Sequence, residues 1–320
     1  MSQAIVTESK LVAIADAIRS VGSLSGSMTL DQMASAILSL SGGGGGGNND
    51  LYDYAMGTLS VIDLSIPYVR GSAFQGWSTI KTVNLPDASY ISYGAFSYCS
   101  SLEKVTAQSC LSLDYYAFTN CYSLTSAVFP NLTYMGSYAF SNCSNLSYLF
   151  CPELVSMKTQ ALRSAGIISA SFPKLKEANI TLCSRLTHIS CPELETLSYG
   201  TMGGNPNLIE VFIPKVSYLS NHTLGQNTNL PRVSLPALKY IRYQAFQDDN
   251  HLSIIDLTGV SQVPTLVGTN AFANTPIYNS SYLGYFGSIY VPSSLYTAFT
   301  TATNWATFSA RITSDPVPTT

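Results

Sequence analysis

The sequence predicts a β-rich solenoid of about ten coils, each of about 22 residues. Three observations predict it. Segments 80–101, 102–123 and 124–145 align without gaps at 22 residues. Each unit opens with an alternation of apolar and other residues, which is typical of a strand with one buried face. A column of small residues, many of them polar, recurs three positions before each new unit. One such unit cannot bury its own apolar face, so stacked units are expected to share a continuous core.

The register of the repeat follows from its first residues. The units begin at Leu59, Ile80, Leu102, Leu124, Leu146, Ile167, Leu186, Leu208, Leu230 and Leu252. With the first residue counted as offset 0, offsets 3 and 5 are apolar throughout, and further inward positions are expected at offsets 8 and 11. Proline follows at offset 6 in seven of the ten units. Because proline cannot donate to a strand ladder, it is expected to end the strand.

The small-residue column predicts a hydrogen-bonded bend. Its members are Trp77, Cys99, Cys121, Cys143, Ser164, Cys183, Asn205, Asn227, Asp249 and Asn274. A position that accepts Cys, Asn, Ser or Asp favours a short side chain that bonds a neighbouring backbone group. The other cysteines, Cys110, Cys151 and Cys191, fall on inward offsets. Seven cysteines cannot all pair within one chain, so we expect free thiols in a reducing compartment.

Units such as IKTVNLPDASYISYGAFSYCSS resemble the BspA-type leucine-rich repeat. The resemblance covers about residues 59–276, and it implies a leucine-rich-repeat solenoid. The family is known for adhesion and surface recognition, so the resemblance also implies a binding surface. The unit at 167–185 lacks three residues and the unit at 252–276 has three extra, so we expect a kink or bulge at both.

The ends of the chain are expected to differ from the repeat. Residues 1–41 show helical apolar spacing, as at Leu11, Ile14 and Ile18, and predict a helical anchor. Their pattern AIADAIRSVGS…MTLDQMASAI is similar to N-terminal segments of bacteriophage tail-associated proteins, which implies docking to a virion. Residues 42–50 are predicted to be a glycine-rich linker and residues 51–276 the solenoid.

The C-terminal part predicts a strand-helix cap over residues 277–312, followed by a loose tail at 313–320. The segment Ile289-Tyr-Val-Pro292 is expected to form a last strand. A helix is expected to begin near Leu295, with Ser293 or Ser294 as its cap. Four aromatic residues are available to cover the last coil, namely Tyr296, Phe299, Trp305 and Phe308.

Composition limits the classes of function. Charged residues make up 10% of the chain, apolar residues 46%, and the net charge is −3. These values disfavour intrinsic disorder and an electrostatic nucleic-acid binder. No segment has the roughly 18 uninterrupted apolar residues of a membrane helix. The N-terminus lacks the unbroken apolar core of a signal peptide, so we expect synthesis in a host cytoplasm rather than classical secretion.

Motifs for catalysis and metal binding are weak. Gly42–Gly47 lacks the Lys-Ser/Thr pair of a phosphate-binding loop, and no Ser-His-Asp arrangement is recognisable. Cys183, His188 and Cys191 have loosely metal-like spacing, but the repeat directs both cysteines inward and the histidine outward. We therefore expect no enzyme activity, no cofactor and no metal.

Outward-facing side chains are the remaining candidates for function. Candidate receptor contacts on the strand face, at offsets 2 and 4, are Val128, Tyr148, Phe150, Phe212 and Arg232. Tyrosines recur at offset 10, namely Tyr90, Tyr134, Tyr218 and Tyr240, and at offset 13, namely Tyr93, Tyr115, Tyr199 and Tyr243. Tyrosine offers a rigid amphipathic surface that suits recognition of glycans or proteins. The structural alternative is that these rings stack as ladders that stabilise the walls of the coils.

Three functional hypotheses follow. The preferred one is a bacteriophage tail-fibre or tail-tip adhesin in the virion, which binds a bacterial surface glycan or protein non-covalently. Its residues 1–41 would contact other virion tail proteins, and a homo-oligomer such as a trimer is compatible with self-association of these helices. The alternatives are a BspA-like adhesin on a bacterial cell surface and an architectural virion protein that binds no receptor. Nucleic-acid binding and membrane insertion are not expected.

Overall fold

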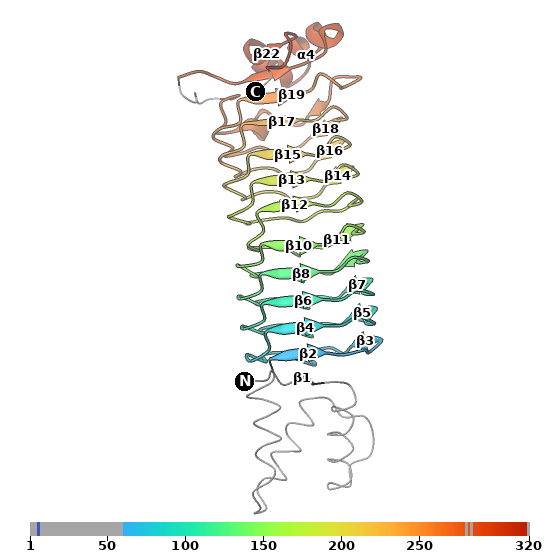
Figure 1. The fold of residues 1–320 in the computed structure, drawn as a ribbon. Coiled ribbons are helices and arrows are strands. Elements are labelled where there is room, and N and C mark those ends of the chain that lie inside the picture. The colour runs from blue at the N-terminus through green and yellow to red at the C-terminus, as the bar shows by residue number, and fades with distance from the viewer. Residues whose placement is uncertain (1–4, 7–59, 279–280, 282–283, 319–320) are drawn as a thin grey trace, which may run out of the picture. The chain divides into compact units, whose positions relative to one another are not determined.

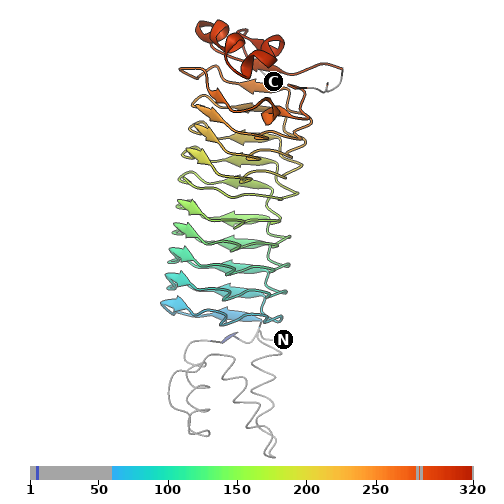
Figure 2. The ribbon, with the colours of Figure 1, turned by 180° about the vertical axis from the view of Figure 1, so that it is seen from behind.

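The structure is a computed structural model that describes residues 5–6, 60–278, 281 and 284–318. Of the predicted helical anchor at 1–41, the structure describes only Ile5–Val6, and these residues form a strand paired in parallel with Val61–Ile62 instead of a helix. The other residues of the predicted anchor, the glycine-rich linker at 42–50 and the start of the predicted solenoid lie outside the described residues. The described chain divides into two compact units, one ending at Cys151 and the other beginning at Pro152. Each unit is a stack of β-coils, which confirms the predicted solenoid class (Figures 1 and 2).

The first unit is built from two parallel sheets that run through successive coils. The first strand of each coil joins one sheet, whose members are β1 (Ile5–Val6), β2 (Val61–Asp63), β4 (Thr82–Asn84), β6 (Lys104–Thr106), β8 (Ser126–Val128) and β10 (Tyr148–Phe150). A second, two-residue strand in each coil joins the other sheet, with members β3 (Tyr68–Val69), β5 (Tyr90–Ile91), β7 (Ser112–Leu113) and β9 (Tyr134–Met135). Strand partners lie one repeat apart, as Val83 does opposite Val105, so the alignment of the sequence is also the register of the sheet.

The second unit repeats this plan and ends in a cap. Its first strands are β12 (Ser169–Ser171), β13 (His188–Ser190), β15 (Glu210–Phe212), β17 (Arg232–Ser234), β19 (Ile254–Asp256) and β21 (Ser288–Tyr290). Its second strands are β11 (Ser156–Met157), β14 (Thr196–Leu197), β16 (Tyr218–Leu219), β18 (Tyr240–Ile241) and β20 (Thr265–Leu266).

The core consists of columns of identical offsets. In the first unit the buried rings of Phe74, Phe96, Phe118 and Phe140 stack one coil on the next. Successive centroids are 4.9–5.2 Å apart, and the ring planes lie within 6° of each other. This distance is close to the spacing of strands in a sheet, so one residue type fits the same place in every coil. The predicted inward columns are therefore confirmed, except that Leu149 at offset 3 is only half-buried.

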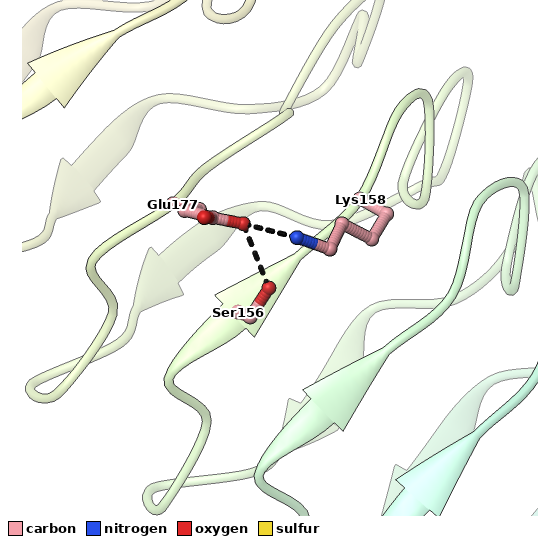
Figure 3. A network of polar contacts seen from close by, with 3 residues as sticks. All are labelled: Ser156, Lys158 and Glu177. Atoms are coloured by element: carbon pink, nitrogen blue, oxygen red, sulfur yellow. Dashed lines mark hydrogen bonds and ion pairs between the residues drawn. The ribbon is translucent and has the colours of Figure 1, made fainter.

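The short coil that begins at Ile167 has lost its second strand. Glu177 occupies that place and makes only an isolated bridge with Ser156, through the amide of Met157 and the carbonyl of Glu177 at 2.9 Å. A side-chain network adds to this bridge (Figure 3). The Glu177 carboxylate accepts a hydrogen bond from Ser156 Oγ at 2.9 Å and pairs with Lys158 Nζ. The three-residue deletion is thus absorbed on the second-strand side of the coil.

In the long coil, the extra residues lie between β19 and β20, before the 3₁₀ turn η1 (Thr269–Phe272). The predicted change of coil geometry is therefore a longer connection between the two strands.

The C-terminal cap contains more structure than one strand and one helix. After β21 come η2 (Ser293–Leu295), α4 (Tyr296–Thr301), η3 (Trp305–Arg311) and β22 (Ile312–Thr313). Phe299, Trp305 and Phe308 are buried as expected, whereas Tyr296, which was also expected to cover the last coil, is exposed. The indole of Trp305 donates to the carbonyl of Pro264 at 2.7 Å. Strand β22 pairs in parallel with β21, so Thr313 belongs to the sheet.

The predicted serine cap of the C-terminal helix was wrong. Helix α4 begins at Tyr296, its N-cap position is Leu295, and no side chain bonds the free amides there. Ser293 instead starts the preceding turn η2, whose own N-cap position is Pro292. The chain enters α4 through this 3₁₀ turn, whereas a side-chain cap needs a residue in extended conformation immediately before the helix.

Candidate functional site

Each regular coil has a third side, which we call the turn face, between its second strand and the next coil. Two residues per coil, at offsets 14 and 18, adopt the left-handed backbone conformation, as Tyr116 and Asn120 do with φ of 59°. Between them lies the Ala-Phe pair that points into the core. The amides of alternate residues donate to carbonyls of the next coil, as Phe96 does to Ala117 at 2.8 Å. The backbone of the turn face is therefore held between coils by hydrogen bonds, without regular strands.

The small-residue column lies directly behind this turn. In the first unit Cys99, Cys121 and Cys143 donate from Sγ to the carbonyl of the phenylalanine one coil earlier, at 3.0–3.1 Å. In the second unit the side chain of Asn205 accepts from the amide of Cys183, and Asn227 accepts from that of Asn205. The predicted ladder of Cys and Asn side chains bonding backbone groups is therefore confirmed.

Two members of this column were assigned wrongly. Ser164 and Asn274 have positive φ, so they occupy the place that offset 18 has in a regular coil, one position before the column. The buried residues Ala165 and Thr275 take the column positions, and Thr275 Oγ1 donates to the carbonyl of Phe272 at 2.7 Å. The error arose because the count ran back from the next unit, and these coils are 21 and 25 residues long.

A groove interrupts the turn face of the second unit. It has a volume of about 430 Å³ and extends across coils from Gln160 to Asp248. Its floor is formed where Gly203 and Gly225 occupy offset 17 of successive coils. In the first unit the same offset carries the buried residues Ser97, Thr119 and Ser141. The hollow therefore coincides with two missing side chains at offset 17, and the glycines Gly200 at offset 14 and Gly204 at offset 18 also line it.

Close backbone approach explains the two glycines. A Cβ atom on Gly203 would lie 2.8 Å from the carbonyl oxygen of Gly225, and one on Gly225 would lie 2.8 Å from that of Gln247. Contacts this short are not tolerated without a shift of the backbone. The groove therefore results from the close approach of backbones in adjacent coils as well as from the lack of side chains at these two positions.

Several side chains with planar amide groups line the groove. Its amide side chains are Gln160, Gln226, Gln244 and Gln247. Arg163 donates from Nη1 to Gln160 Oε1 at 3.2 Å, and Asp248 accepts from the amide of Asn274 at 2.7 Å. The buried Oε1 of Gln247 has no hydrogen-bond partner among the described residues.

Aromatic rings complete one wall of the groove. The rings of Tyr199 and His222 meet edge to face, with centroids 5.5 Å apart, and Tyr199 is 69% exposed. The site therefore combines an accessible ring with several fixed hydrogen-bonding groups. This combination can orient a small polar ligand but includes no nucleophile held by a base.

The candidate receptor contacts of the strand face belong to both units. Tyr148 and Phe150 stand outward at 54% and 41% exposed, with parallel rings 6.4 Å apart, and Val128 pairs with Phe150 in the neighbouring strand. In the second unit Phe212 is 51% exposed. Arg232 is half-buried and donates from Nη1 to the carbonyl of Pro318 at 3.4 Å. The structure brings together Val128, Tyr148 and Phe150.

The tyrosines at offset 10 have neighbours in adjacent coils. The rings of Tyr218 and Tyr240 stack at 5.3 Å, and Tyr90 donates from its hydroxyl to Asp114 at 2.6 Å. Burial, and then this contact with Asp114, raise the pKa of Tyr90 above its ordinary value. Tyr134, in the same row, is half-buried. Tyrosines of this row therefore make ring and hydrogen-bond contacts between coils, as the structural alternative expects.

The tyrosines at offset 13 are exposed. They are Tyr93, Tyr115, Tyr199 and Tyr243. Of these, only Tyr199 lines the groove. Sequence analysis missed the remaining groove residues, although one signal was present: glycine replaces Ser or Thr at offset 17 in two successive units.

The cysteines and His188 lie as the repeat predicted. Cys183 and Cys191 are buried, whereas His188 is exposed on β13 and lies 3.5 Å from Glu210 through Nε2. Within the described residues, no group of three or more His, Cys, Asp or Glu side chains is placed to hold a metal ion. No helix in the described part of the chain is long and apolar enough to cross a bilayer.

Comparison with known families decides the classification. The BspA type leucine-rich repeat region matches residues 51–167 and 164–279 in six copies. The chain belongs to this family. The repeat therefore supports a binding or adhesive role, as the resemblance implied.

Several solved structures are similar to this BspA-type chain at low identity. A leucine-rich repeat protein of T. pallidum is 22% identical, covers 50% of this chain and 72% of its own, and has a TM-score of 0.40. A leucine-rich cell surface protein of Faecalibacterium prausnitzii is 15% identical, with coverages of 79% and 82% and a TM-score of 0.39. The pneumococcal vaccine antigen PcpA is 15% identical, with coverages of 79% and 77% and a TM-score of 0.36. Likenesses at this level do not identify a common function. No curated protein matches the chain.

Proposed function

We propose that this BspA-type chain is a receptor-binding adhesin of a bacteriophage tail, which binds a molecule of the bacterial surface through its repeat. The observation that carries the binding role is the groove on the turn face of the second unit. It is concave and about 430 Å³, within the size range of ligand sites, and it combines an exposed ring with amide side chains. The binding is non-covalent and requires no catalytic group, metal or cofactor.

The assignment to a phage tail rests on the sequence of residues 1–41, which is similar to segments of tail-associated proteins. In this proposal the N-terminal segment contacts other virion proteins, and the repeat carries the receptor site. Deleting residues 1–41 should prevent incorporation of the chain into tails. Particles that incorporate the shortened chain at the normal level would contradict the docking role.

The binding role is tested with the full chain, labelled with a fluorophore and incubated with a panel of bacterial strains. We expect at least one strain to be labelled, and an excess of unlabelled chain should compete. Gly200→Tyr places a bulky ring in the groove and should abolish labelling. A Cβ at Gly200 meets no atom within 4 Å, and the first unit already carries tyrosines at this offset, Tyr116 and Tyr138, with positive φ.

Gly94→Tyr is the matched control, because Gly94 has the same offset and a φ of 59° but belongs to the first unit and does not line the groove. It should label cells as the unchanged chain does. Absence of labelling on every strain would favour the architectural hypothesis. Loss of labelling by Tyr148→Ser with Phe150→Ser, while Gly200→Tyr still labels, would move the receptor contact to the strand face and refute the groove.

A further inference from the structure

We infer that the groove of the second unit takes a neutral oligosaccharide. This inference rests on the proposed receptor-binding function and names the ligand chemistry of that site. Three properties of the lining lead to it: the density of side-chain amides, the exposed aromatic ring, and the balance of charge.

The amides match a ligand rich in hydroxyl groups. Each glutamine offers two N–H donors and a carbonyl acceptor in one plane, which suits a hydroxyl that both donates and accepts. Four glutamines line one groove in a chain that otherwise uses few long polar side chains.

The aromatic wall matches the apolar face of a sugar ring. Tyr199 keeps most of its surface exposed, and His222 contacts it edge to face, which restrains its orientation. A pyranose has a face of C–H groups that stacks on such a ring, while its hydroxyls point to the sides. A rigid ring also loses little conformational entropy on binding.

The charges disfavour an anionic ligand. Arg163 and Asp248 carry opposite charges, and each already contacts an amide side chain, Gln160 and Asn274 respectively. A phosphate or carboxylate site would need an excess of cationic or backbone donors. A protein partner would need an apolar anchor pocket, and Leu182 is the only aliphatic side chain in the lining.

The test is binding of the labelled full chain to an array of immobilised neutral hexose and N-acetylhexosamine oligosaccharides. Sialylated and phosphorylated versions and a set of peptides serve as comparisons. We expect binding to neutral members, and solution titration of the best one should show a loss of about tenfold or more for Tyr199→Ala and for Gly200→Tyr.

The matched controls, Tyr115→Ala and Gly94→Tyr, change the same offsets in the first unit and should bind as the unchanged chain does. Circular dichroism verifies that each variant is folded. If Gly200→Tyr is unfolded, Tyr199→Ala decides alone, because it removes an exposed ring.

Stronger binding to anionic glycans or to peptides would overturn the inference, as would equal binding by Tyr199→Ala and the unchanged chain. A chain that labels cells through the groove but binds no neutral oligosaccharide would retain the proposed function and lose this ligand class. A chain that labels no cells but binds neutral oligosaccharides in the groove would retain this ligand class and lose the proposed function.

Discussion

Asp249 is the residue of the buried column that we expect to lower the free energy of unfolding most, and replacing it with asparagine should stabilise the protein. Its side chain is fully buried, and Oδ1 accepts a hydrogen bond from the amide of Asn227 at 2.7 Å. Oδ2 has no partner among the described residues. One coil earlier, Asn227 uses its Nδ2 to donate to the carbonyls of Met202 and Leu224. From the repeat we expect Asp249 Oδ2 to face the equivalent carbonyls, which would repel an ionised oxygen.

The expected magnitude follows from these contacts. A buried polar atom without a partner costs about 1–3 kcal/mol, and a restored hydrogen bond contributes ~1 kcal/mol. We expect Asp249→Asn to raise the free energy of unfolding at pH 7 by about 1–3 kcal/mol. In a unit of this size that corresponds to an increase in melting temperature of roughly 2–10 °C.

The pH dependence gives the sharper test. Burial raises the pKa of Asp249 well above its ordinary value of 3.8. The folded state therefore holds its proton more tightly than the unfolded state does. The stability that this proton provides is complete below the unfolded pKa and is lost as pH rises toward the folded pKa. The advantage of Asp249→Asn should therefore be small at pH 3, grow with pH, and level off above the folded pKa.

Thermal and urea unfolding, followed by circular dichroism across pH 3–8, measure the difference between the two proteins. Asn227→Asp is the matched control, because it introduces a second buried carboxyl in the same column and should destabilise at neutral pH. An Asp249→Asn variant that is less stable at pH 7, or whose advantage does not change with pH, would refute this account of the column.

Three further predictions concern stability and thiol chemistry. Phe118→Ala opens the stacked phenylalanine column and should cost about 3–5 kcal/mol in urea unfolding, whereas Tyr98→Ala on the exposed surface should cost much less. The thiols should react with Ellman's reagent only after unfolding, because all seven cysteines are buried. Burial also raises the pKa of four thiols to about 12, namely those of Cys110, Cys151, Cys183 and Cys191. Fast reaction of the folded chain would contradict this prediction. Hydrogen bonds from Lys158 and then Ser156 lower the pKa of Glu177. Glu177→Gln should therefore reduce the free energy of unfolding at pH 7 by at most about 1 kcal/mol. This difference in stability should vanish as pH falls through the folded pKa of Glu177, or when the salt concentration is raised.

The core could be predicted from the sequence because every coil places the same offset in the same environment. Apolar residues at offsets 3, 5 and 11 repeat often enough that one weak unit, such as the one at Ile167, does not obscure the register. The column at offset 19 was harder, because Ser164 and Ala165 differ by one position and both residues suit a bend. Only backbone conformation separates them: Ser164 has a φ of 56° and Ala165 is buried.

The groove could not be predicted in the same way. Repetition reveals what coils share, whereas a binding site arises where one coil differs from the next. The glycines at 203 and 225 looked like ordinary turn residues, and the glutamines at 226, 244 and 247 are separated in sequence by up to 21 positions. Their convergence depends on the stacking of three coils. Tyr199 was named as a candidate because tyrosine recurs at offset 13, but nothing in that row distinguished it from Tyr93 or Tyr115.

Positions of the core and positions of the groove meet different structural requirements, and the turn face shows why. Its backbone ladder and the inward Ala-Phe pair must be kept for a coil to stack, but offsets 13, 14, 17 and 18 do not belong to the apolar columns of the core. In the first unit the offset 17 side chains fill the face, as Ser97 does by donating to the carbonyl of Gly94 at 3.0 Å. In the second unit Gly203 and Gly225 leave it open and bring adjacent backbones so close that serine cannot simply be restored. Gly225→Ser should therefore destabilise the coil as well as narrow the groove, whereas Gly200→Tyr should block the groove at little cost in stability. Equal effects of the two substitutions on the melting temperature would show that the hollow reflects side-chain size alone.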